Sequence, residues 1–112
     1  MRDIVVSITE FSALDLRVGQ IIGIEDIEMA RKPMYKLKID LGELGTRTIV
    51  GGIKAFYTKE QLLGKKIIVV ANLEPKSIAG VISEGMLLAA GDDQSISLLL
   101  PDKDVKAGTK IG

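Results

Sequence analysis

Short runs of apolar and β-branched residues, separated by glycine, recur along most of this chain. Runs of this kind, bounded by turn-forming residues, are typical of short β-strands. We therefore predict six strands, over Leu16–Ile24, Tyr35–Leu41, Thr46–Gly51, Lys66–Asn72, Met86–Ala90 and Ser95–Leu100. The fold class that follows from this pattern is all-β.

The second of these runs shows the clearest alternation of residue types. Apolar and charged residues take turns there, in the order Tyr35, Lys36, Leu37, Lys38, Ile39, Asp40 and Leu41. Because successive side chains of a strand point to opposite faces, one face of this strand is apolar and the other is charged. We expect a half-buried strand that shows Lys36 and Lys38 to solvent and packs Tyr35 in the core.

One short helix is predicted between the third and fourth strands. Thr58 and Gln61 have the spacing of a capping box, and Gly64 suits a left-handed helix end. Five strands closed into a barrel, with one helix between strands three and four, form the layout of an OB-fold. Another small barrel, or an open sheet with the same strand count, is the alternative. A chain of 112 residues has room for one domain, so we expect a single domain over 1–112 with its barrel over about 12–90.

The composition removes most catalytic and metal chemistry. The chain has no cysteine and no histidine, which excludes disulfides, thiol nucleophiles, imidazole bases and Cys/His zinc sites. The glycines at 42–45 and 51–52 lack the Gly-Lys-Ser/Thr ending of a phosphate loop. The acidic clusters at 25–28 and 92–93 lack the ligand spacing of a calcium loop. We therefore predict a protein that is not an enzyme and that holds no metal and no cofactor.

The apolar runs are also too short for a membrane. The longest of them, 67–71 and 86–90, fall far below the ~18 residues that span a bilayer. The first residues lack the basic and apolar regions of a secretory signal. We expect a cytoplasmic protein without membrane association.

Charge is unevenly distributed, although fifteen basic and fifteen acidic residues cancel. Residues 1–30 hold two basic and six acidic side chains, residues 31–80 hold ten and four, and residues 81–112 hold three and five. Cations that gather on one flank of a barrel can hold nucleic-acid phosphates, so we expect the basic middle to form such a flank. The alternative is that these side chains are ordinary solvated surface residues. With only four aromatic residues, successive base stacking is disfavoured, and recognition by shape fits better.

Six blocks of the sequence occur in the order and spacing of one known family. They are Asp15–Gly19, Tyr35–Gly42, Arg47–Ile53, Leu63–Lys66, Val69–Pro75 and Ser83–Ala90. Together they resemble the tRNA-binding domain found at the C-terminus, or as the separate β subunit, of methionyl-tRNA synthetases. The resemblance implies an OB-fold that binds tRNA largely by shape, as a non-catalytic auxiliary subunit or stand-alone relative of the synthetase. It also makes a synthetase catalytic chain a possible partner.

The candidate RNA-binding residues combine the cations of the middle segment with matches to the family blocks. They are Arg31, Lys32, Lys36, Lys38, Arg47, Lys54, Asn72, Lys76, Ser83, Glu84 and Met86. Three of the polar matches have structural alternatives: Asn72 can end a strand, while Ser83 and Glu84 can shape the loop before Gly85. For Met86 we favour a place in the core over contact with a base.

The resemblance further implies a homodimer built by the segments that flank the barrel, 1–11 and 91–112. Ile4–Val6 and Ser95–Leu100 would supply apolar surface for it, because both lie outside the expected barrel. Alternatively, these segments only cap the barrel. The stretch Ala30–Leu37 resembles a different branch of the family, export-related chaperones that bind unfolded polypeptides. Polypeptide binding on the same homodimeric scaffold is therefore the alternative function, and an enzyme ranks third.

Overall fold

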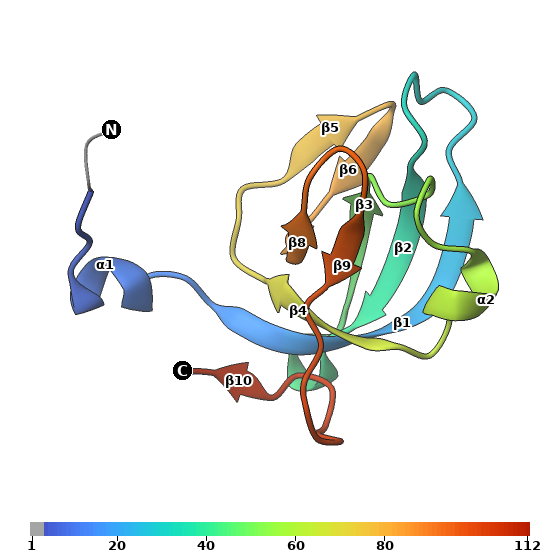
Figure 1. Cartoon of the computed structure of the whole chain (residues 1–112). Coiled ribbons are helices and arrows are strands. Elements are labelled where there is room, and N and C mark those ends of the chain that lie inside the picture. Colours follow the sequence, from blue (N-terminus) through green and yellow to red (C-terminus); the bar gives the residue numbers. More distant parts are fainter. Residues whose placement is uncertain (1–3) are drawn as a thin grey trace.

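The computed structural model describes residues 4–112; residues 1–3, part of the expected flanking segment 1–11, lie outside the described residues. The elements in chain order are α1 (Ile8–Ser12), β1 (Leu16–Asp26), β2 (Tyr35–Asp40), the 3-10 turn η1 (Gly42–Leu44), β3 (Thr46–Gly51), α2 (Lys59–Leu62), β4 (Lys66–Val70), β5 (Lys76–Ile78), β6 (Val81–Ser83), β7 (Met86–Leu87), β8 (Ala89–Gly91), β9 (Ile96–Leu98) and β10 (Lys110–Ile111). Figure 1 shows a curled sheet with α1 standing away from it.

The central sheet has the strand order β3-β2-β1-β4-β7, with every neighbouring pair antiparallel. The sheet curls until β3 meets the segment that follows β6, where the Glu84 amide donates to the Thr48 carbonyl oxygen at 2.8 Å. The Val50 amide donates to the Ser83 hydroxyl at 2.9 Å along the same seam. These bonds replace a regular ladder and leave a nearly closed five-stranded barrel. The all-β, OB-like prediction is confirmed.

The inward face of the barrel is the apolar core. Tyr35, Leu37 and Ile39 of β2 are buried in one cluster with residues of β1, β3 and β4. Tyr35 is only 4% exposed, and its hydroxyl donates to the Tyr57 carbonyl oxygen at 2.8 Å. The predicted alternation along β2 is therefore confirmed, and Tyr35 packs in the core as expected.

The short helix predicted after the third strand is confirmed as α2. The Gln61 amide donates to the Thr58 hydroxyl at 3.2 Å, and the Thr58 amide donates to the Gln61 side chain at 2.8 Å. These two reciprocal bonds form the predicted capping box. Gly64 has a φ of +85°, as its place after the helix requires.

A second capping box, which the sequence analysis did not identify, begins α1. The Glu10 amide donates to the Ser7 hydroxyl at 3.0 Å, and the Ser7 amide donates to the Glu10 carboxylate at 2.9 Å. These bonds hold one helical turn that buries none of its residues. The apolar side chains around it are exposed, with Ile4 at 86%, Val5 at 90% and Ile8 at 77%.

The C-terminal segment corrects two expectations. The predicted strand Met86–Ala90 is divided into β7, which pairs with β4, and β8, which pairs with β9. Ser95–Leu100 does not lie outside the barrel as expected: β9 pairs with β8, and Leu98, 6% exposed, belongs to the core. Leu99 and Leu100 keep exposed apolar surface, at 39% and 49%.

Two further pairings were not predicted. Strands β5 and β6 form a hairpin whose turn is Ala79-Gly80, with both residues at positive φ. The chain then ends on β10, which pairs with the first residues of β1. A 2.6 Å hydrogen bond from the Gly108 amide to the Val18 carbonyl oxygen fastens this terminal segment to the barrel. Among residues 4–112, no helix is long and apolar enough to cross a membrane.

Candidate nucleic-acid interface

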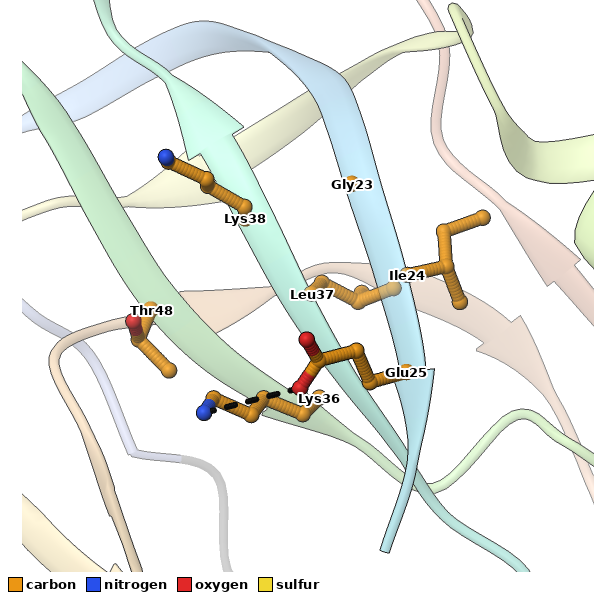
Figure 2. Close-up of a pocket in the computed structure, with 7 residues that line it drawn as sticks. All are labelled: Gly23, Ile24, Glu25, Lys36, Leu37, Lys38 and Thr48. Carbon is orange, nitrogen blue, oxygen red and sulfur yellow. Dashed lines mark ion pairs between the residues drawn. The ribbon is translucent and has the colours of Figure 1, made fainter.

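The outer face of β1, β2 and β3 carries the two lysines that the alternation of β2 places toward solvent. Lys36 lies directly opposite Glu25 of β1, and Lys38 lies between Gly23 of β1 and Thr48 of β3. With Ile24 and Leu37, these residues line a hollow of about 320 Å³, drawn in Figure 2. The hollow is open over Lys38 because Gly23 has no side chain to cover it. We call this hollow the outer groove.

Two connecting segments flank the outer groove at one end of the barrel. The loop 27–34, with exposed Arg31 and Lys32, joins the end of β1 to the start of β2. The hairpin β5–β6 reaches the same end. The Ser83 hydroxyl, at the end of β6, accepts from the Val50 amide near the end of β3. The next residue of β3, Gly51, pairs with Tyr35 at the start of β2, so the rest of the hairpin lies beyond this end of the sheet. In OB-folds, the face of strands 2 and 3 and the loops at these two positions bind oligonucleotides.

Some candidate cations are unpaired, whereas others have carboxylate partners. Within residues 4–112, Arg31, Lys32, Lys38 and Lys76 make no ion pair. Lys36 Nζ lies 3.7 Å from the Glu25 carboxylate. The unpaired set therefore keeps charges that no carboxylate of the described residues neutralises.

Lys54 is held by a carboxylate at the end of β1. Its Nζ lies 2.9 Å from Asp26, whose second oxygen accepts a hydrogen bond from Lys59 at 3.0 Å. The hydrogen bond from Lys54, followed by that from Lys59, lowers the pKa of Asp26 below its ordinary value of 3.8. Lys54 also lies 6.0 Å from the centroid of the Tyr35 ring. Lys54 therefore stabilises the junction of β1 and β2 besides carrying charge.

The expectation of one basic flank is only partly met. Arg47 Nη1 donates to the Ala71 carbonyl oxygen at 2.7 Å, so this guanidinium ties β3 to the end of β4. Lys66 pairs with Asp104 at 2.7 Å, and Lys65 lies over the Tyr57 ring. These three cations are therefore held by a carbonyl oxygen, a carboxylate and an aromatic ring, and none of them lines the outer groove.

Three candidate residues from the family blocks, Asn72, Ser83 and Glu84, make structural bonds. Asn72 accepts from the Asp15 amide at 2.8 Å and donates to the Ala13 carbonyl oxygen at 2.7 Å, which fixes the chain entering β1. Ser83 is buried in the seam beside β3. The Glu84 carboxylate accepts from the Thr48 amide at 3.1 Å. All three residues therefore hold the ends and the seam of the barrel together.

Met86 departs from its expected place in the core. Its side chain is 48% exposed, whereas the next residue, Leu87, packs against the core cluster. Because β7 pairs with β4 in extended conformation, only one of two consecutive side chains can face inward, and the register assigns that position to Leu87. Met86 is consequently available to a partner.

Sequence reasoning missed Gly23, Glu25 and Thr48 as parts of the outer groove. Glycine inside a strand pattern is a signal of close backbone approach or of a bulge, and β1 does change register between Ile21 and Gly23. Which residues Gly23 and Glu25 face is set by that register, which the linear sequence does not show. Within residues 4–112, no cluster of three or more carboxylates is arranged to hold a metal ion.

Comparisons with known proteins find relatives over nearly the whole chain. Residues 16–110 match a family model described as "Putative tRNA binding domain". The chain is 52% identical over 106 residues to the methionine-tRNA ligase of Pyrococcus horikoshii, covering 95% of this chain and 14% of the ligase. It is 50% identical over 107 residues to the ligase of Methanocaldococcus jannaschii, covering 95% of this chain and 16% of that protein. The chain thus spans a small part of the length of these curated relatives.

Solved structures of similar size also match. The CsaA chaperone protein from Picrophilus torridus is 40% identical, with a TM-score of 0.90, and the match covers 96% of this chain and all of that one. A MetRS-related protein from Pyrococcus horikoshii is 34% identical, with a TM-score of 0.88, covering 98% of this chain and all of that one. From the family match across its barrel and the identity with the synthetase relatives, this chain belongs to the tRNA-binding domain family.

Proposed function

We propose that this chain binds tRNA largely by shape and acts as a non-catalytic auxiliary subunit or stand-alone relative of methionyl-tRNA synthetase. The observation that carries the proposal is the outer groove, in which Lys36 and Lys38 project from one face of β2 in a chain of this family. Arg31 and Lys32 on one flank and Lys76 on the other extend the cationic surface beyond the groove.

The chemistry of this surface favours the RNA backbone over stacked bases. Lysine ammonium groups attract phosphates and release their counterions. Tyr35, the aromatic residue nearest the groove lysines in sequence, is buried and cannot stack on a base. The Thr48 hydroxyl, on β3 beside Lys38, can exchange hydrogen bonds with a 2′-hydroxyl, a group that distinguishes RNA from DNA. Exposed Met86 can add apolar contact.

A salt titration of binding to full-length tRNA tests this function. Affinity should fall linearly in log–log form, with a slope of about 0.7 to 0.9 for each neutralised phosphate. Lys36→Ala and Lys38→Ala should each weaken binding at low salt and flatten the slope, while the protein stays folded. Lys103→Ala, which removes the same charge from an exposed site outside the outer groove, is the matched control. Absence of tRNA binding at low salt, or equal binding by all variants, would contradict the proposal.

We also propose that the chain forms a homodimer through its flanking segments. Support comes from the apolar side chains of residues 4–14, which lie on the surface around α1 without covering the barrel core. Leu99 and Leu100 provide further exposed apolar surface near the other terminus. Ile8→Asp should shift the protein from dimer to monomer in analytical ultracentrifugation, whereas Ile82→Asp, at an exposed site on β6, should not. A monomeric parent protein would refute this arrangement.

The synthetase relatives suggest where such a module acts. Because the chain matches a part of methionine-tRNA ligases, we propose a methionyl-tRNA synthetase catalytic chain as a partner, in the cytoplasm. Co-purification of the two chains, with and without ribonuclease treatment, distinguishes a direct contact from one bridged by tRNA. Failure to associate under either condition would restrict the chain to a stand-alone role.

Polypeptide binding is the second candidate function. It is supported by the similarity over all of the CsaA chaperone chain and by the exposed apolar residues around α1. A permanently unfolded polypeptide, reduced and carboxymethylated, should then bind with an affinity that salt changes little. Binding of this probe without binding of tRNA would favour the chaperone function over the RNA function.

A further inference from the structure

We propose that Glu25 competes with RNA phosphate for Lys36, and thereby holds the tRNA affinity of the outer groove below the level that its lysines allow. The inference rests on the proposed tRNA binding and concerns how that site is adjusted. Glu25 would thus have a negative regulatory role within a groove whose two lysines attract anions.

The register of the β-ladder creates the contact. Glu25 of β1 and Lys36 of β2 are directly paired, so both side chains leave the sheet on the same outer face. Figure 2 shows the carboxylate turned toward the Lys36 amine within the groove. Lys36 Nζ and Glu25 Oε2 are 3.7 Å apart, longer than a hydrogen bond, and the side chains are 43% and 71% exposed. A loose, solvated ion pair of this kind is easily displaced.

Lys38 provides an internal comparison. It faces Gly23 on β1 and Thr48 on β3, neither of which carries charge. Among the residues that line the outer groove, Glu25 is the one carboxylate. The neighbouring Asp26 is occupied by Lys54 and Lys59. Lys38 is therefore free to meet a phosphate, whereas Lys36 must first leave Glu25.

The energetic consequence is a gain in affinity when the carboxylate is neutralised. Replacing Glu25 by glutamine keeps its size and removes the charge that holds Lys36. We expect tRNA affinity at low salt to rise by about 1.5- to 5-fold, the range that corresponds to an exposed ion pair. The log–log salt dependence should become steeper by up to about 0.9, because Lys36 then neutralises a phosphate more fully.

The experiment compares four variants with the parent in salt titrations of full-length tRNA: Glu25→Gln, Lys36→Ala, the Glu25→Gln/Lys36→Ala double variant, and Glu43→Gln. Glu43 is an exposed residue of η1 outside the outer groove, so its replacement changes the net charge by the same amount. Urea unfolding verifies that each variant is folded. The inference predicts a gain for Glu25→Gln that Glu43→Gln does not reproduce, and no gain for Glu25→Gln once Lys36 is absent.

Three results would overturn the inference. Equal affinities of Glu25→Gln and Glu43→Gln would show that only net charge matters. A gain that persists in the Lys36→Ala background would show that Glu25 repels RNA directly instead of acting through Lys36. A parent and a set of variants that all fail to bind tRNA at low salt would remove the proposed function itself, which the first two results leave intact.

Discussion

Gly23 in β1 lies directly across from Lys38 in β2, and a Cβ atom at Gly23 would lie 3.3 Å from the Cβ of Lys38. The missing side chain is what leaves the outer groove open above Lys38. The φ of Gly23 is not in the left-handed region, so its backbone can accept a larger residue with a small shift of Lys38.

Gly23→Val therefore tests the groove without altering any charge. The added side chain should occupy the space over Lys38 and lower tRNA affinity several-fold, while β-branched valine suits the strand. Gly23→Ala should produce a smaller loss in the same binding titration. An affinity for Gly23→Val equal to that of the parent would indicate that RNA binds at another surface.

Ser83→Ala should weaken the seam that closes the barrel. The Ser83 hydroxyl, in a residue 4% exposed, accepts from the Val50 amide and donates to the Gly85 carbonyl oxygen. Its loss leaves the Val50 amide without that partner, which costs about 1–3 kcal/mol of the free energy of unfolding. The urea midpoint should fall with an unchanged m-value. Ser77→Ala, at an exposed position of β5, should unfold like the parent.

Gly108→Ala should loosen the C-terminal segment from the barrel. Gly108 has a φ of +89°, and an added Cβ would collide with the Leu41 carbonyl oxygen. We expect a loss of about 1–3 kcal/mol in the free energy of unfolding from this backbone strain. Faster proteolysis within 101–112 would report the local release. Gly52→Ala, where a Cβ would meet open space, is the control, and an equal effect of both changes would exclude this explanation.

Asp26 should make stability depend on pH in acid. Its pKa in the folded protein lies below 3.8 because Lys54 and Lys59 donate to the carboxylate. The stabilisation is therefore complete above the unfolded pKa and is lost as pH falls through the folded pKa. The difference in urea midpoint between the parent and Asp26→Asn should be constant near neutrality and shrink below pH 3.8. A difference that does not change with pH would rule out this contribution.

Local patterns allowed much of the fold to be predicted. The alternation along Tyr35–Leu41 identified both the buried and the exposed face of β2, because strand geometry depends only on neighbouring residues. The capping box of Thr58 and Gln61 likewise identified α2. The hairpin β5–β6 was missed because its turn uses Ala79-Gly80 instead of a strong turn pair such as Asn-Gly.

The candidate site could be predicted only in part. The lysines of β2 were found, but the roles of Arg47, Asn72, Ser83 and Glu84 depend on partners 24 or more residues away in the chain. Distant partners of this kind cannot be read from spacing. Leu98 was placed outside the barrel for the same reason, although it packs in the core and its amide donates to the Tyr57 hydroxyl.

By itself, the sequence determined the all-β class, the exposed lysine face of one strand, the absence of thiol and imidazole chemistry and the resemblance to a tRNA-binding family. Only the tertiary structure decided which carboxylate faces which lysine, where the barrel closes and which side chains line the outer groove. The physical reason is that composition and alternation act within a strand, whereas the pairing of Glu25 with Lys36 and the opening over Lys38 arise from the register between strands.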